Sequence, residues 1–139
     1  MTGPFERIVS QGQIFKFDFE AVNVPDAAGT ANIVGGGSGT QIPVPLPGAI
    51  LGMAVRGNAL LSTGTLLFRP TVNGSALTTF SLTSLTSAIQ QAYRMRGKDL
   101  FPIKAGDRLG VDFTKTGTIS PTTIDFIISL YVLLGDFEP

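Results

Sequence analysis

Apolar and polar residues alternate with a period of two in several parts of the chain. Segment 14–20 places Phe15, Phe17 and Phe19 at alternate positions, with three charged residues between and after them. Segment 109–113 repeats the pattern with apolar residues at its first, third and fifth positions. Successive side chains of a strand point to opposite faces, so both segments predict half-buried antiparallel strands whose apolar side chains face the core.

The longest apolar run, residues 124–134, consists almost entirely of apolar and β-branched residues. It predicts a central strand that is buried on both faces, or that has one core face and one face against another subunit. Further strands are expected at 49–56 and 65–72. Asn73-Gly74 follows the second of these, and this pair favours a type I′ hairpin turn whose returning strand we place within 76–82.

Segment 83–96 allows two interpretations. Leu85, Ile89 and Tyr93 recur at helical spacing, whereas Ile89, Gln91, Tyr93 and Met95 would share one face of a strand. The strand is the preferred interpretation, and a short helix stays open.

Glycine and proline punctuate the apolar segments. Residues 35–39 contain four glycines and one serine and predict a surface loop. The alternating prolines at 43, 45 and 47 suit an edge strand, because proline cannot donate to a neighbouring strand. Turn signals about every ten residues predict about eight short strands in an all-β, jelly-roll-like antiparallel β-sandwich. We expect one domain at 13–139, preceded by an N-terminal arm or first edge strand at 1–12.

The surface of this chain is expected to carry little charge. Charged residues make up 14% of the 139 residues, against roughly 25% in ordinary domains, while 43% are hydrophobic. A chain of this composition either exposes an unusually neutral surface or covers part of it with other subunits. Ten basic and ten acidic residues balance and are scattered, so no nucleic-acid partner is expected. No targeting segment or membrane span is evident, so synthesis in the cytoplasm is expected.

The residue types present exclude the catalytic triads that depend on His or Cys. The chain has no Cys and no His, which excludes Ser-His-Asp and Cys-His catalysis and disfavours zinc. Asp107, Asp112 and Asp125 are the carboxylates most open to pairing or calcium binding. However, Asp107 belongs to a turn and Asp112 alternates with core residues, so structural roles are preferred. We therefore expect a non-enzymatic protein with no cofactor and no metal.

Four runs carry a resemblance to a known group of proteins: residues 45–56, 63–68, 72–74 and 101–111. Their order of strands and turns resembles small jelly-roll modules of tailed-phage virion proteins, among them capsid-decoration proteins and fibre-tip domains. It is also distantly similar to trimeric C1q/TNF-type jelly rolls. The resemblance covers residues 40–134 and rests on a pattern of strands and turns. The chain has no collagen-like or coiled-coil stalk, which favours decoration over a fibre.

The resemblance implies a structural role on the virion. Such modules form trimers on the outer capsid surface and stabilise the shell by linking neighbouring units of the major capsid protein. The N-terminal stretch would be the arm toward the capsid, with Phe5, Ile8 and Val9 as its contact residues. The expected location of the protein is therefore the capsid surface of a virion.

The outer face of the last strand is the expected trimer interface. Because residues 124–134 are apolar at almost every position, the sequence leaves two alternating sets of candidates. The first set is Phe126, Ile128, Leu130 and Val132. The second set is Ile127, Tyr131 and Leu133.

A receptor- or glycan-binding fibre-tip module is the alternative function. Sugar sites often combine an exposed aromatic ring with polar or charged neighbours. Tyr93 with Arg94 and Arg96 is the best patch of this kind in the sequence. Trp is absent, and most Phe residues alternate with polar ones as core residues do, which weighs against this alternative.

Overall fold

The structure is a computed structural model that describes residues 12–24, 29–37, 39–58, 63–77, 82–83, 91–95, 101–120 and 124–136. All regular secondary structure in this part of the chain is β-strand, and the strands form two antiparallel sheets. The predicted all-β, antiparallel β-sandwich is confirmed. Within the described residues, no helix has the length and apolar character needed to cross a membrane. The predicted arm at residues 1–12 lies outside the description except for Gly12.

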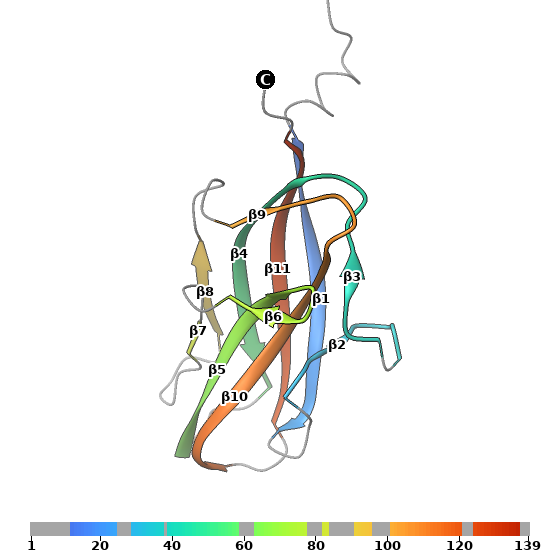
Figure 1. Cartoon of the computed structure of the whole chain (residues 1–139). Coiled ribbons are helices and arrows are strands. Elements are labelled where there is room, and N and C mark those ends of the chain that lie inside the picture. The colour runs from blue at the N-terminus through green and yellow to red at the C-terminus, as the bar shows by residue number, and fades with distance from the viewer. Residues whose placement is uncertain are drawn as a thin grey trace, which may run out of the picture.

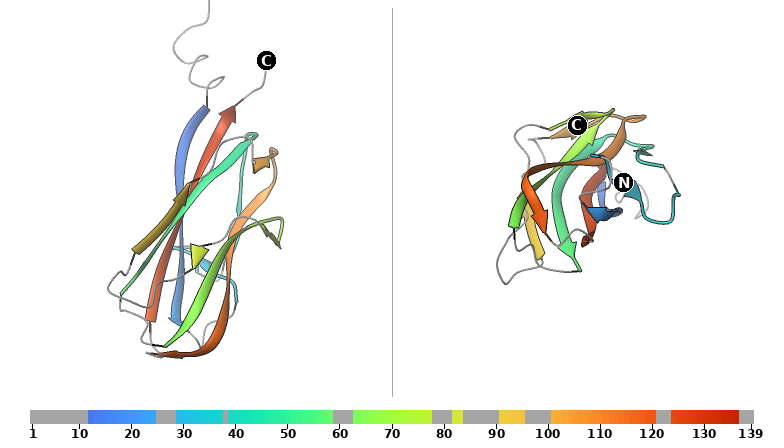
Figure 2. Two further views of the ribbon diagram at one scale, coloured as in Figure 1. Left: turned by 90° about the vertical axis from the view of Figure 1, so that its left-hand side faces the viewer. Right: turned by 90° about the horizontal axis from the view of Figure 1, so that it is seen from below.

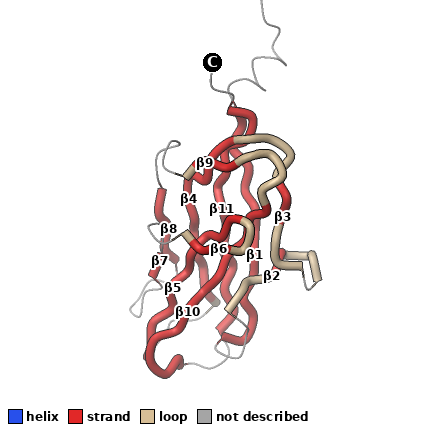
Figure 3. The backbone as a smooth tube through the Cα atoms, in the orientation of Figure 1, coloured by secondary structure: helices blue, strands red, loops and turns tan. Residues whose placement is uncertain are grey.

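The described residues form eleven strands in the two sheets, where the sequence predicted about eight, and five of the eleven contain only two residues. Sheet A contains β1 (Gly12–Val24), β2 (Asn32–Ile33), β4 (Gly48–Gly57), β8 (Gln91–Met95), β9 (Pro102–Ile103) and β11 (Ile124–Asp136). Sheet B contains β3 (Ile42–Pro43), β5 (Thr63–Val72), β6 (Ser75–Ala76), β7 (Leu82–Thr83) and β10 (Arg108–Ser120). Figure 1 labels these strands, and Figure 3 shows how strand and loop alternate along the chain.

The chain crosses repeatedly between the two sheets, which gives the sandwich its jelly-roll-like connectivity. Sheet A has the order β2-β1-β11-β4-β8, with β9 also paired to β4. Sheet B has the order β3-β10-β5-β6, with β7 also paired to β5. The first and last long strands, β1 and β11, are therefore neighbours. Figure 1 shows β5 and β10 in front of β11 and β4, and in the left view of Figure 2 these two strands lie to the right of β1, β11 and β4 as a separate layer.

The core lies between the two sheets and is made by the alternating inward residues of the long strands. Phe68 is fully buried at its centre, with its ring 5.3 Å from that of Phe126 and 6.1 Å from that of Phe113. The expected inward positions of β10 and the inward Phe19 are buried, whereas Phe15, nearer the end of β1, keeps 41% of its surface exposed. The largest fully buried side chains are Phe19, Phe68, Ile50, Met53, Leu66, Leu109, Ile124, Ile128 and Leu130.

The backbone agrees with the sequence predictions for the proline-containing edge and for part of segment 83–96. Pro43 lies in β3, which pairs only with β10 among the described strands, as expected for a proline-containing edge. In segment 83–96, residues 91–95 form a strand, which is the preferred interpretation for that part. Residues 84–90 and 96 lie outside the described residues.

One side of the sandwich is closed by a segment that passes from one sheet to the other. Ala31 donates its amide to the Val111 carbonyl of sheet B at 2.9 Å, and Val34 donates to the Asp18 carbonyl of sheet A at 3.1 Å. Between them, Ile33 of β2 pairs with β1. Such sheet-switching strands form the corners of β-sandwiches. The segment satisfies backbone groups of β1 and β10 that would otherwise be exposed.

The turn after β5 is fixed to the start of β10 by one asparagine. Asn73 and Gly74 have φ angles of 53° and 85°, as the predicted type I′ turn requires. The Asn73 amide donates to the Arg108 carbonyl at 2.8 Å, and its side-chain Oδ1 accepts from the Arg108 amide at 3.0 Å. Its Nδ2 donates to Asp107 Oδ1 at 3.0 Å. One residue therefore sets both the turn and the register of the neighbouring strand.

Replacing Asn73 should destabilise the fold through two separable effects. Asn73→Ala loses two side-chain hydrogen bonds and places alanine in the left-handed region, so we expect a loss of about 2–3 kcal/mol in the free energy of unfolding. Asn73→Gly keeps the backbone conformation accessible and should cost about 1 kcal/mol less. Urea unfolding at equal protein concentration measures both. Equal losses for the two variants would show that backbone strain contributes nothing at this turn.

Candidate functional site

The exposed large hydrophobic side chains of the described chain are confined to sheet A and its immediate continuation. Ile14, Phe15 and Val22 on β1 are 63%, 41% and 45% exposed, and Ile127 on β11 is 40% exposed. Val34, which directly follows β2, is 45% exposed. None of the sheet B residues whose side chains the structure describes is such a residue. Ile14, Val22 and Ile127 point away from the core, so the outer face of sheet A is the first candidate for contact with another molecule.

The side chains of β11 point alternately into the core and onto this outer face. Phe126, Ile128, Leu130 and Val132 are the inward set and are at most 4% exposed. The first candidate set for the trimer interface is therefore inaccessible to a second subunit, because these side chains pack between the sheets. The alternate set of Ile127, Tyr131 and Leu133 lies on the outer face, where Ile127 is exposed and the other two are half-buried.

The register extends the outer face of sheet A across three strands. Tyr131 lies opposite Lys16 of β1 and Gly52 of β4, and Ile127 lies opposite Glu20 and Arg56. The outer face of sheet A comprises the outward residues of these three strands. They are Ile14, Lys16, Asp18, Glu20 and Val22 on β1, Gly52, Ala54 and Arg56 on β4, and Ile127, Ser129, Tyr131 and Leu133 on β11.

A short polar network lies in the middle of this face. Ser129 donates its hydroxyl to Asp18 Oδ1 at 2.6 Å, and Lys16 lies 3.5 Å from Asp18 Oδ2. Asp18 is thus held by one neighbour on its own strand and one on β11. The sequence alternation placed Lys16 and Asp18 on the polar side of β1, but it gave no sign of the contact with Ser129, which is 111 residues away.

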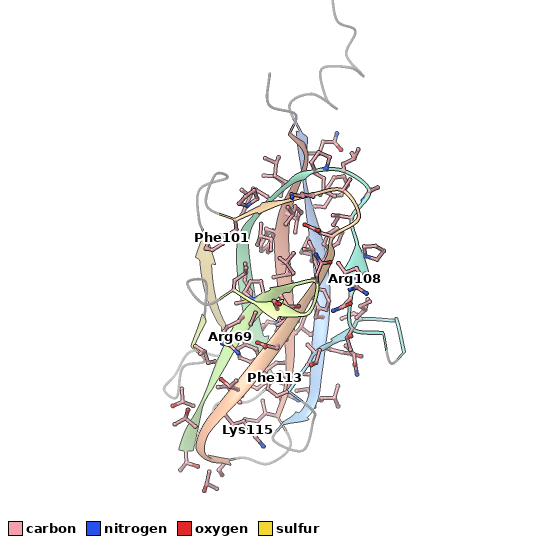
Figure 4. All side chains as sticks on the ribbon, viewed as in Figure 1. Arg69, Phe101, Arg108, Phe113 and Lys115 are labelled. Atoms are coloured by element: carbon pink, nitrogen blue, oxygen red, sulfur yellow. The ribbon has the colours of Figure 1, made fainter. Side chains whose placement is uncertain are left out.

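The outer face of sheet B has a different character. Arg69 of β5 forms a two-point ion pair with Asp112 of β10, with Nε and Nη2 each 3.3 Å from a carboxylate oxygen. A β-carbon added at Gly110 would lie 2.8 Å from the Thr40 carbonyl oxygen, so the chain at residues 40–41 covers this face closely. Figure 4 shows Arg69 and Arg108 on this front layer. The outer face of sheet B is therefore partly covered, and its described ion pair is formed, by residues of the same chain.

The two long strands at the chain ends, β1 and β11, meet at one end of the sandwich. Gln13 pairs with Leu134 there, next to the exposed Ile14 and Phe15 (Figure 1). The segment before Gly12 is therefore attached beside exposed apolar side chains. The predicted capsid-contact residues Phe5, Ile8 and Val9 lie outside the described residues.

The three aspartates weighed as catalytic or calcium-binding groups have separate structural surroundings. Asp112 pairs with Arg69. The backbone amide of Asp125 donates to Asn58 Oδ1 at 3.0 Å. Asp107 accepts from the Lys104 amide at 2.8 Å, which is the turn role expected for it. Within the described residues, no three His, Cys, Asp or Glu side chains are close enough together to hold a metal ion.

The carboxylate of Asp107 is stabilised in its charged form. The hydrogen bond from the Lys104 amide, followed by the one from the Asn73 side chain, lowers the pKa of Asp107 from its ordinary value of 3.8. Both donors favour the ionised carboxylate over the protonated one. This group therefore contributes stability that depends on pH.

We expect the Asp107 contribution to disappear in acid. Because the pKa is lower in the folded state, the unfolded chain binds the proton first, so the contribution is complete above about pH 4 and is lost as pH falls through the folded pKa. Urea unfolding between pH 7 and pH 2.5 should therefore show a steeper loss for the wild type than for Asp107→Asn. Parallel curves for the two proteins would contradict the stabilising role of the charged carboxylate.

The alternative sugar-binding patch has only its backbone described. Tyr93 and Arg94 lie on β8, whose side chains are outside the description, and Arg96 lies beyond the described residues. No protein-family model matches the chain, and no curated protein matches it either. Among the described residues, the outer face of sheet A is therefore the best candidate surface for contact with another molecule.

Proposed function

We propose that this protein is a structural virion protein that decorates the outer surface of a phage capsid as a homotrimer. Neighbouring copies contact one another through the outer face of sheet A, and the assembled trimer binds the major capsid protein. The role is non-enzymatic. The jelly-roll-like sandwich is the fold that the sequence resemblance to capsid-decoration proteins implies.

The single observation that carries the proposal is that, among the described side chains, the exposed large apolar ones lie on sheet A or directly after its strand β2. Complete burial of one such side chain contributes about 1.5–3 kcal/mol, and the partly exposed Ile127 and Ile14 still retain a share of that free energy. A second copy lying on this face would remove them from water. The low charge content of the chain fits a surface that is partly covered in its working state.

The end of the sandwich where β1 begins is the end that we assign to the capsid. Exposed Ile14 and Phe15 are located there, and the segment with Phe5, Ile8 and Val9 is attached there. A trimer would present three such ends on the same side. Binding three ends to neighbouring capsid subunits links those subunits, and the binding free energy then opposes the opening of the shell.

The oligomeric state tests the interface directly. We expect light scattering after size exclusion to give a mass near three chains for the wild type. Ile127→Asp should give mainly monomer, because a charge buried without a partner costs several kcal/mol at the subunit contact. Its circular dichroism should match that of the wild type, since Ile127 faces away from the core. A wild-type monomer at high concentration would overturn the proposed interface.

Ile128→Ala is the matched control on the neighbouring residue. Ile128 is fully buried between the sheets, so the substitution should lower the free energy of unfolding by about 2–4 kcal/mol without adding a charge to the outer face. At temperatures where this variant is folded, it should keep the wild-type mass. Loss of the trimer in Ile128→Ala alone would show that the wrong face of β11 has been assigned.

The virion role requires a second experiment with capsids. Wild-type protein should co-sediment with undecorated capsids of the phage that encodes the chain and raise the temperature at which those shells open. Deletion of residues 1–9 should leave the trimer intact and abolish co-sedimentation. A wild-type trimer that binds no capsid, and instead binds a cell-surface glycan, would replace decoration with the fibre-tip alternative.

A further inference from the structure

Three outer-face residues of sheet A lie at the same level along the strand direction. Glu20 of β1 pairs with Ile127 of β11, and Ile127 pairs with Arg56 of β4. Neighbouring strands are about 4.8 Å apart, so the backbones of Glu20 and Arg56 are about 10 Å apart with Ile127 between them. An exposed apolar side chain is therefore flanked by an acid on one side and a base on the other.

The two charges of this row differ from the charged groups that have a charged partner on the two sheets. Asp18 is held by Ser129 and Lys16, and Arg69 on the opposite sheet is paired with Asp112. Neither Glu20 nor Arg56 forms an ion pair with any residue in the described part of the chain. Arg56 is exposed and Glu20 is half-exposed, so both are accessible to a partner from outside.

The arrangement is complementary to a second copy of itself. Rotation about an axis parallel to the strands keeps every residue at its level, so the row of one copy meets the same row of its neighbour. When the β1 side of one copy approaches the β4 side of the next, acid meets base at the same level. Rotations of this kind include the threefold axis of a closed ring.

We infer that Glu20 of each copy pairs with Arg56 of the next copy around the trimer, with Ile127 buried beside the pair. This inference rests on the homotrimer of the proposed function and adds the residues that set its register and direction. The apolar residue supplies the driving force, and the charge pair selects the head-to-tail approach over arrangements that bring like charges together.

Charge reversal tests the pair. Glu20→Arg and Arg56→Glu should each raise the trimer dissociation constant at least tenfold, because each places like charges together. The variant carrying both changes should return to within about threefold of the wild type. The concentration dependence of the mass, measured by sedimentation equilibrium at low and high salt, gives these values. Arg108→Glu makes the same charge change on the exposed surface of sheet B and should leave the trimer unchanged.

Mixing the two single variants distinguishes a ring of three from a twofold dimer. In a twofold contact one copy of each variant satisfies both pairs, so an equimolar mixture would give a fully restored heterodimer. In a head-to-tail ring of three, at least one contact must join like variants, so the mixture should restore the trimer only in part. A fully restored heterodimer would overturn the ring arrangement.

The results also separate failure of this inference from failure of the proposed function. A wild-type trimer whose mass is unaffected by both single reversals would overturn the charge pair and leave the interface in place. A wild-type monomer would overturn both.

Discussion

Strand β11 is paired along nearly its whole length on both sides, with β1 and with β4, and the two sheet faces of the molecule follow from that pairing. Because successive side chains alternate, fixing the register of this strand fixes which apolar residues become core. Ile128 and Leu130 then pack between the sheets, and Ile127 is left on the outside. A register shifted by one residue would exchange these roles and expose the core set.

Hydrogen bonds at the rim of the sandwich fix the position of sheet B relative to sheet A and the register of its strands. The segment from Gly29 to Val34 bonds to β10 and then to β1, which ties the sheets together at one side. At the start of β10, Asn73 and Asp107 join the turn after β5 to the turn before β10. These contacts are polar and lie at the rim, so they set geometry while the core supplies most of the stabilising free energy.

The sequence predicted the elements with clear alternation and could not choose between faces where alternation is lacking. In β1 and β10, charged residues occupy the face opposite the apolar ones. The predicted inward residues of β10 and Phe19 of β1 are buried, whereas Phe15 near the end of β1 stays partly exposed. In β11 almost every position is apolar, so periodicity alone permits either face to be core. For this reason the first set of outer-face candidates, Phe126, Ile128, Leu130 and Val132, lies in the core instead. Only the register with β1 and β4 decides the question.

Long-range pairing explains the other features that sequence reasoning missed. Arg69 and Asp112 were both visible as polar positions on strands, but nothing local shows that β5 and β10 are neighbours with these two residues opposite each other. The same holds for Ser129 with Asp18, and for the row of Glu20, Ile127 and Arg56. The two-residue strand β2 is too short to show alternation, so its bridging role was absent from the prediction.

Apolar residues on an outer sheet face create a risk of indiscriminate association, and the charge pattern of sheet A limits it. Non-specific stacking of two such faces would bring Glu20 and Arg56 out of water without a matched partner, which costs free energy for each unpaired charge. Only approaches that place acid beside base avoid that cost. The same few charged groups that make the sheet look half-polar in sequence therefore restrict the partners that its apolar residues accept. A chain with zero net charge has little overall repulsion to keep copies apart, so in the proposed trimer the local charges would have to supply most of the specificity.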